Sequence, residues 1–118
     1  MAKFLFICSA NECRSRTAEI YFQFHYKRSH LFRSAGINNY SCKKHGGTIL
    51  QQYMLDVSDW IICAEQVHSD FIVKHFDKKY LSKIHVLNLG DTENFMSEQL
   101  IELLEQKFNP NEEKYRKI

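Results

Sequence analysis

The feature that most constrains the fold is a short apolar run, Phe4–Ile7, that gives way abruptly to a polar stretch. Four apolar residues suffice for a buried strand but are too few for a helix of their own. From Ala18 onward the apolar residues recur at helical spacing. The chain is therefore predicted to begin as a strand, a tight loop and a helix, with Cys8 ending the strand and Arg14 opening the helix.

The rest of the chain continues this alternation. Apolar periodicity predicts three further strands and four helices in all. The strands are 31–36, 57–63 and 84–89, and the helices are 15–28, 48–55, 64–76 and 98–108. The order β-α-β-α-β-α-β-α predicts the α/β class, with a single doubly wound domain whose four-stranded parallel sheet carries helices on both faces.

Capping and composition mark the boundaries of this domain. Ser97 is the expected N-cap of the last helix, and Pro110 is expected to stop the chain from continuing that helix. We assign residues 1–110 to the domain and expect the polar tail, 111–118, to be poorly ordered. Residues 37–45 are rich in polar side chains and are expected to form a loop.

The inward faces of the helices are predicted to include several polar side chains. His25, His75 and Tyr53 fall on the inward stripes of their helices. His68 and His75 lie seven residues apart on one stripe, but no nearby carboxylate or cysteine completes a metal site. We expect no metal ion and no cofactor, and we expect both histidines to pack at the core boundary.

Composition and charge narrow the class of protein. The chain has 118 residues, 44% of them hydrophobic, which is enough for one globular domain with a buried core. A net charge of +2 without a long basic run argues against nucleic acid, and no apolar run is long enough for a signal peptide or a membrane span. Four cysteines without a secretory signal favour a reducing, cytoplasmic compartment, and their lack of paired CxxC spacing argues against a zinc site.

The loop after the first strand combines a nucleophile with an anion site. Backbone N–H groups and the positive end of the helix dipole point into one small space, which suits a phosphate group and favours a thiolate at Cys8. Asn11 tolerates a left-handed backbone, and the Ser15 hydroxyl can donate to a thiolate. The loop therefore predicts phosphoryl transfer through cysteine; the alternative is an inert core cysteine. The expected phosphate-binding residues are Ser9, Ala10, Asn11, Glu12, Cys13, Arg14 and Ser15.

The same loop resembles that of the low-molecular-weight protein tyrosine phosphatases. Their loop reads C-x-G-N-x-C-R-S-P and is followed by A-E, which Cys8–Ser15 and then Ala18-Glu19 match. Ala10 stands where that family usually has glycine, and Arg16 where it usually has proline. The closer likeness is to a short branch of predicted tyrosine phosphatases near this length, and it extends to the S-A-G element at 34–36.

If the protein is a phosphatase, each residue of the site has a separate catalytic role. Cys8 would attack phosphorus to form a phosphocysteine, and Arg14 would bind two phosphate oxygens through its planar guanidinium group. Asp91, at the end of the fourth strand where the family's aspartate lies, would be the general acid, with Glu93 as its rival. Cys13, five residues beyond Cys8, could capture an oxidised Cys8 as a disulfide.

The expected substrate is a phosphorylated protein, with phosphotyrosine favoured, or a small phosphate ester. Phe95 and Tyr40 could frame an aromatic ring, whereas the charge of Glu12 on the loop rim would oppose an incoming dianion. An arsenate reductase on the same fold would need a downstream cysteine pair, but Cys63 stands alone and Cys42 lies elsewhere. The other alternative, a non-catalytic module that binds phosphate or phosphopeptides, would have little use for a cysteine and an acid at two strand ends.

Overall fold

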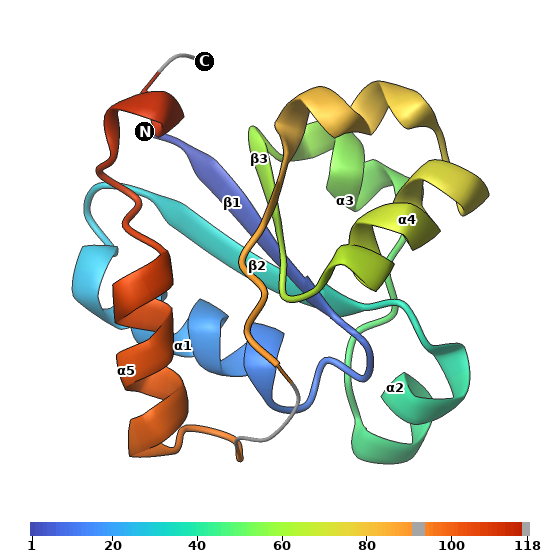
Figure 1. Ribbon diagram of the computed structural model, residues 1–118, viewed down its shortest axis with the longest axis horizontal. Coiled ribbons are helices and arrows are strands. Elements are labelled where there is room, and N and C mark those ends of the chain that lie inside the picture. The colour runs from blue at the N-terminus through green and yellow to red at the C-terminus, as the bar shows by residue number, and fades with distance from the viewer. Residues whose placement is uncertain (91–93, 117–118) are drawn as a thin grey trace.

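Strands and helices alternate along the chain (Figure 1), which a computed structural model describes for residues 1–90 and 94–116. The strands are β1 (Lys3–Cys8), β2 (Leu31–Gly36), β3 (Trp60–Cys63) and β4 (Ile84–Val86). The α-helices are α1 (Arg14–Tyr26), α2 (Asn39–His45), α3 (Gln52–Val57), α4 (Gln66–His75) and α5 (Glu98–Lys107). Two 3₁₀ helices are η1 (Lys78–Lys83) and η2 (Glu113–Tyr115).

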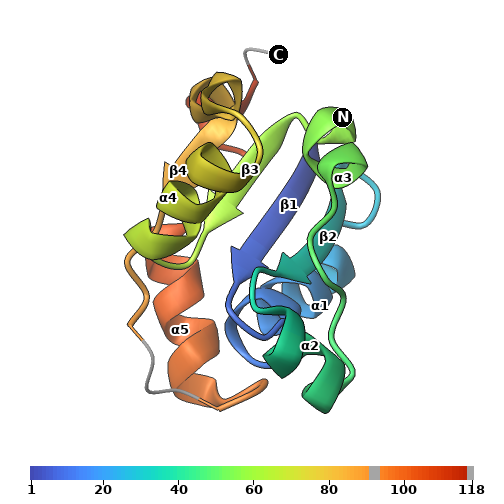
Figure 2. The same cartoon turned by 90° about the vertical axis from the view of Figure 1, so that its right-hand side faces the viewer.

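The four strands form one parallel sheet in the order β2-β1-β3-β4. The strand that ends at Cys8 is therefore central, with neighbours on both sides. Helices α1 and α5 cover one face of the sheet, and α3 and α4 cover the other (Figure 1 and Figure 2). This arrangement confirms the predicted α/β class with a doubly wound, four-stranded parallel sheet.

The two faces of β1 supply the centres of two cores. Phe4 and Phe6 point to the side of α1 and α5, while Leu5 and Ile7 point to the side of α3 and α4, as the two-residue period of a strand requires. The first core is rich in aromatic rings, and the Phe4 ring lies 5.3 Å from that of Phe108, edge to face. Burial on both faces explains why the run that predicted this strand is continuously apolar.

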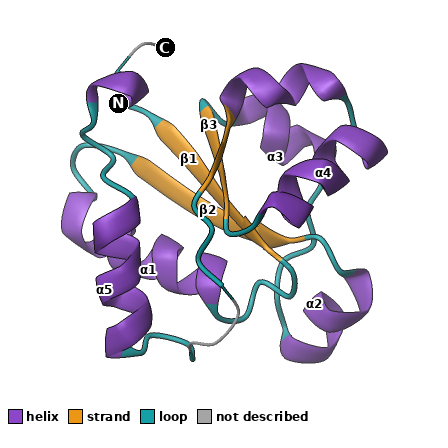
Figure 3. Cartoon of the chain, in the orientation of Figure 1, coloured by secondary structure: helices purple, strands orange, loops and turns teal. Residues whose placement is uncertain are grey.

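A helix stands where a loop was predicted (Figure 3). The side chain of Asn38 accepts a hydrogen bond from the Ser41 N–H at 2.9 Å and caps the start of α2. Gly46 ends the helix in a left-handed conformation, with φ of 72°. The prediction of a loop at 37–45 is wrong because caps at both ends, rather than an amphipathic stripe, define this seven-residue helix.

The next helix, α3, begins at Gln52 and not at residue 48 as predicted. Ile49 forms a parallel bridge with Gly36, and Leu50 is buried before the helix begins. These apolar residues belong to an extended segment that packs beside β2, although their spacing resembled a helical stripe. Tyr53, predicted to face inward, is consequently exposed.

Two strands are shorter than predicted. β3 begins at Trp60 and not at residue 57, because α3 continues to Val57. β4 ends at Val86 and not at residue 89, although the backbone N–H groups of Leu87 and Leu89 still bond the carbonyl groups of Cys63 and Ala64. The chain beyond Val86 thus follows the sheet without forming a regular ladder.

Two histidines at helix ends and the C-terminal tail also differ from the predictions in their burial. His25 and His75 are exposed in the last turns of α1 and α4, where the residues that follow them, Tyr26 and Phe76, pack against the cores instead. In the tail, expected to be poorly ordered, the Tyr115 side chain is buried and its ring lies 5.1 Å from that of Phe4. An aromatic ring filling the core holds this segment on the domain as far as Arg116.

Candidate active site

The loop between β1 and α1 forms a tight turn around the Cys8 thiol. The Cys8 Sγ lies 2.9 Å from the Ser15 Oγ in the first turn of α1. Asn11 has φ of 54°, the left-handed conformation that its sequence position predicted. The backbone therefore turns sharply enough to bring the end of the strand against the start of the helix.

The side chain of Asn11 ties this loop to two other segments. Its amide nitrogen donates to the Ser15 Oγ at 2.9 Å and to the Ser34 Oγ at 2.8 Å, and its oxygen accepts from the Thr48 N–H at 2.8 Å. Because Ser15 accepts from the amide, its own hydroxyl hydrogen is left to donate to the Cys8 sulfur. The Ser34 hydroxyl donates in turn to a carboxylate oxygen of Glu19.

Two glycines let neighbouring backbone approach the loop. A Cβ atom on Gly36 would lie 2.6 Å from the carbonyl oxygen of Ser9 and 2.8 Å from the Asn11 nitrogen. A Cβ atom on Gly47 would meet the carbonyl oxygen of Ala10 at a still shorter distance. The contact of Gly47 joins residues distant along the chain, so no local pattern in the sequence indicates it.

Arg14 is 7% exposed and reaches across to the end of the sheet. Its Nη1 donates to the carbonyl oxygen of Gly90 at 2.8 Å and lies 3.9 Å from a carboxylate oxygen of Glu65. The same Glu65 carboxylate accepts a hydrogen bond from the Gly90 N–H. The arginine predicted to bind phosphate is thus oriented by the residue directly before Asp91, and Glu65 is a participant that the sequence analysis missed.

His68 connects α4 to the loop. Its Nδ1 accepts a hydrogen bond from the Glu65 N–H at 3.0 Å, and its Nε2 lies 3.1 Å from the Ser9 Oγ. A backbone N–H can only donate, so the neutral ring carries its proton on Nε2 and donates to Ser9. Glu65 and His68 also form a reciprocal cap at the start of α4, a three-residue spacing that could have drawn attention to Glu65 in the sequence.

The two acid candidates, Asp91 and Glu93, lie outside the described residues. The chain on either side of them is attached to the loop and to α1. Gly90 bonds Arg14, and the Met96 N–H donates to the Thr17 Oγ1 at 2.8 Å. The segment that carries both carboxylates therefore begins and ends beside the start of α1.

A hollow of about 390 Å³ adjoins the outer rim of the loop. Glu12 and Phe95, both singled out in the sequence, line it together with Arg16, His45 and Gly46. The His45 Nδ1 lies 3.3 Å from a carboxylate oxygen of Glu12. Tyr40, the other aromatic candidate, is exposed on α2 and does not line this hollow.

The sequence matches no protein-family model and none of the curated proteins. Solved structures do match over most of the chain. The tyrosine phosphatase Wzb from Escherichia coli K30, in complex with phosphate, has a TM-score of 0.72 at 21% identity, covering 91% of this chain and 94% of that one. A low molecular weight protein tyrosine phosphatase from Streptococcus pyogenes has a TM-score of 0.67 at 14% identity, covering 98% and 97%. The YwlE arginine phosphatase from Geobacillus stearothermophilus has a TM-score of 0.65 at 19% identity, covering 87% and 86%.

The chain has the fold of the low-molecular-weight protein tyrosine phosphatases. In this phosphatase fold, three of the four thiols have a raised pKa. Burial raises the pKa of Cys13, with a further contribution from the nearby carboxylate of Glu12. Burial also raises the pKa of Cys42, and it raises that of Cys63 to about 12. A thiol with a raised pKa is less ionised at neutral pH, and so reacts more slowly there, than a thiol with the ordinary pKa.

The described part of this phosphatase fold offers no cluster of three or more histidine, cysteine or carboxylate side chains that could hold a metal ion. In particular, His75 is exposed at the end of α4, whereas His68 is buried and bonded to Ser9 and Glu65. None of the helices within 1–90 and 94–116 combines the length and apolar character needed to cross a bilayer.

Proposed function

We propose that the protein is a cysteine-dependent phosphatase that hydrolyses phosphate monoesters, with phosphotyrosine in proteins as its favoured substrate. The observation that carries the proposal is the 2.9 Å contact between the Cys8 Sγ and the Ser15 Oγ inside a strand–loop–helix turn. A thiol there faces the amino end of α1, where backbone N–H groups and the helix dipole favour an anion. Small phosphate esters can use the same site.

In the first step the Cys8 thiolate attacks phosphorus, and the bond between phosphorus and the ester oxygen breaks. Asp91 gives its proton to the leaving oxygen, so that the phenol or alcohol departs neutral. The Ser15 hydroxyl, already oriented by Asn11, donates to the thiolate before the attack. The product is a phosphocysteine on Cys8.

Stabilisation of the transition state is electrostatic. The guanidinium group of Arg14 offers two parallel N–H groups to two of the equatorial phosphate oxygens. The backbone N–H groups of Ser9 to Arg14 take up the remaining negative charge. Because these donors belong to a loop fixed by Asn11, they need little reorganisation when charge develops.

In the second step water attacks the phosphocysteine, and the bond between phosphorus and sulfur breaks. The carboxylate of Asp91, deprotonated in the first step, takes a proton from this water as a general base. Phosphate leaves, and Cys8 returns as a thiolate. The same acid thus serves both steps in opposite directions.

The role of Asp91 is supported by its neighbours. It follows Gly90, whose carbonyl group accepts from Arg14 and whose N–H bonds Glu65. Arg14 is thus bonded to the residue directly before Asp91, which supports a substrate shared by the guanidinium group and the Asp91 carboxyl group. Glu93 is two residues more distant and is the rival acid.

The decisive experiment compares the wild-type protein with Cys8→Ser on a phosphotyrosine peptide and on para-nitrophenyl phosphate. The wild type should release phosphate, and rapid quenching followed by mass spectrometry should find one phosphoryl group on Cys8. Cys8→Ser should lose turnover but still bind phosphate, because a hydroxyl group is far less ionised than a thiol. Cys63→Ala, which removes a thiol from the core of β3, is the control and should keep its activity. Appreciable turnover by Cys8→Ser would refute the proposal.

A further inference from the structure

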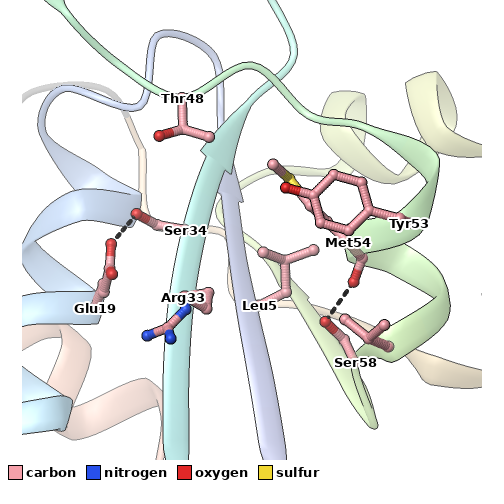
Figure 4. A pocket seen from close by; sticks show the side chains of 9 residues that line it. Leu5, Glu19, Arg33, Ser34, Thr48, Tyr53, Met54 and Ser58 are labelled. Carbon is pink, nitrogen blue, oxygen red and sulfur yellow. Dashed lines mark hydrogen bonds between the residues drawn. The ribbon is translucent and has the colours of Figure 1, made fainter.

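A second cavity, of about 280 Å³, lies beside the free edge of β2, away from the rim hollow. Figure 4 shows Glu19 and Ser34 on one side of this strand, and Tyr53 and Met54 on the other. The cavity therefore follows the edge of the sheet between α1 and α3. Nothing in the proposed phosphatase mechanism uses it.

The backbone of β2 has one set of groups turned toward β1. The Leu31 N–H donates to the Ala2 carbonyl group at 3.0 Å, and the Ile37 N–H donates to the Cys8 carbonyl group at 3.0 Å. In a parallel ladder such bonds recur at every second residue, so Arg33 lies in this set and also faces β1 with its backbone. The residues that alternate with this set, namely Phe32, Ser34 and Gly36, therefore turn their backbone N–H and C=O groups to the outer edge of the sheet.

On the outer edge of β2, the backbone groups at both ends of the strand have hydrogen-bond partners, whereas those in the middle have none in the part of the chain that the structure describes. The Phe32 N–H donates to the Gln23 side chain at 2.9 Å. The Gly36 N–H donates to the Thr48 carbonyl group at 2.8 Å, and the Gly36 carbonyl group accepts from the next extended segment. Among the described residues, the backbone N–H and C=O groups of Ser34 have no hydrogen-bond partner.

This isolated pair of backbone groups needs a partner. Ser34 is only 8% exposed, and a buried N–H or C=O group without a hydrogen bond is costly, so native structures pair such groups with protein or water. A single residue of an antiparallel strand can satisfy both groups at once, because paired residues exchange both N–H···O bonds. An exposed strand edge is the usual place for such an addition.

The side chains around Ser34 define what an added strand should carry. Arg33 is exposed, its side chain makes only one hydrogen bond within the described chain, to the Phe32 carbonyl group at 3.3 Å, and that side chain forms no ion pair there. The Glu19 carboxylate lies on the opposite face, bonded to the Ser34 hydroxyl. On the α3 side, Tyr53 is 62% exposed and Val57 is 57% exposed. Side chains of an added strand alternate between these two faces.

We propose that the edge of β2 at Ser34 is a docking site for an extended peptide, which adds to the sheet as a short antiparallel strand. The residue opposite Ser34 carries a basic side chain toward Glu19. The residue after it lies opposite Arg33 and is acidic, and the residue before it is apolar and packs toward Tyr53. The site adjoins the phosphate loop through the hydrogen bond from Asn11 to the Ser34 hydroxyl group, but its existence does not depend on the proposed phosphatase activity.

The test measures binding of a probe peptide, acetyl-Leu-Lys-Glu-Val-amide, to the full isotope-labelled chain by amide NMR. Binding should shift the Ser34 and Arg33 signals and slow hydrogen exchange at the Ser34 N–H. Methylating the backbone nitrogen of the probe's lysine removes the donor to the Ser34 carbonyl group and should weaken binding about tenfold or more. Arg33→Glu should weaken binding about fivefold to tenfold, and a probe with lysine in place of glutamate should restore it.

Lys78→Glu makes the same change of charge on η1 and should leave binding unaltered. Four outcomes would overturn the proposal. They are equal binding of the methylated probe, equal losses in the two charge variants, shifts confined to the phosphate loop, and concentration-dependent dimerisation that protects the Ser34 N–H without any peptide. The last outcome would assign the edge to a second copy of this chain. Because no activity is measured, the result stands whether or not the protein is a phosphatase.

Discussion

Replacing Asn11 by alanine tests whether one side chain holds the phosphate loop together. The change removes three hydrogen bonds, to Ser15, Ser34 and the Thr48 N–H, each contributing about 1 kcal/mol. Alanine must also adopt a φ near 54°, which costs about 1 kcal/mol more than for asparagine. We therefore expect Asn11→Ala to lower the free energy of unfolding by about 4 kcal/mol, measured by urea denaturation at constant pH.

Asn11→Gly separates the two contributions. It loses the same three hydrogen bonds but adopts a positive φ without steric cost, so its loss should be about 1 kcal/mol smaller than that of Asn11→Ala. Asn39→Ala, on the exposed first turn of α2, is the matched control and should change stability by less than about 0.5 kcal/mol.

Two results would refute this reasoning. A loss of less than about 1 kcal/mol in Asn11→Ala would mean that water replaces the side chain and that the loop is held by its backbone. Equal losses in the alanine and glycine variants would mean that the left-handed conformation of residue 11 carries no cost. In either case the loop geometry would have to depend on other contacts, such as the close approach of Gly36 and Gly47.

Three further predictions concern the loop and the acid. Asp91→Asn should slow hydrolysis of a phosphotyrosine peptide about 10²–10⁴-fold and slow hydrolysis of an activated aryl phosphate less, whereas Glu93→Gln should be near neutral on both; a larger loss in Glu93→Gln would move the acid there. Peroxide should inactivate the enzyme reversibly through a Cys8–Cys13 disulfide found by peptide mapping, and over-oxidised Cys8 alone would contradict this. Because burial and a nearby carboxylate raise the pKa of Cys13, the rate of closure should keep rising above about pH 8.5, the ordinary thiol pKa. Gly47→Ala should cost about 1–3 kcal/mol in urea denaturation because its Cβ atom meets a carbonyl oxygen of the loop, and an unchanged midpoint would show that the segment can move away.

Local pattern determined the elements that the sequence could predict. The apolar run Phe4–Ile7 predicted β1 because a central strand is buried on both faces and its signal needs no distant partner. Ser97 predicted the start of α5, where its side chain accepts from the Leu100 N–H at 3.2 Å. The left-handed turn at Asn11 could be predicted in the same way, since its cause is the residue itself.

Predictions failed where the same local pattern is compatible with two structures. Ile49 and Leu50 have helical spacing with later apolar residues, but they form an extended segment because a bridge to Gly36 is available there. The helix α2 has no apolar stripe and depends on its two caps. Tyr115 lies in a polar segment, but its side chain is buried in the core, where its ring packs against that of Phe4. Backbone pairing with Gly36 decided the first case, and an aromatic contact at long sequence separation decided the last.

The candidate site likewise contains residues that the local sequence predicts and residues that only the tertiary structure brings together. Cys8, Arg14 and Ser15 could be predicted because six to seven residues span the whole loop, so their proximity is a property of the local chain. Only the tertiary structure brings Glu65 within 3.9 Å of Arg14, because that contact joins residues 51 positions apart. The physical reason is the parallel sheet, which brings the ends of β1, β3 and β4 to one edge whatever the distance between them along the chain.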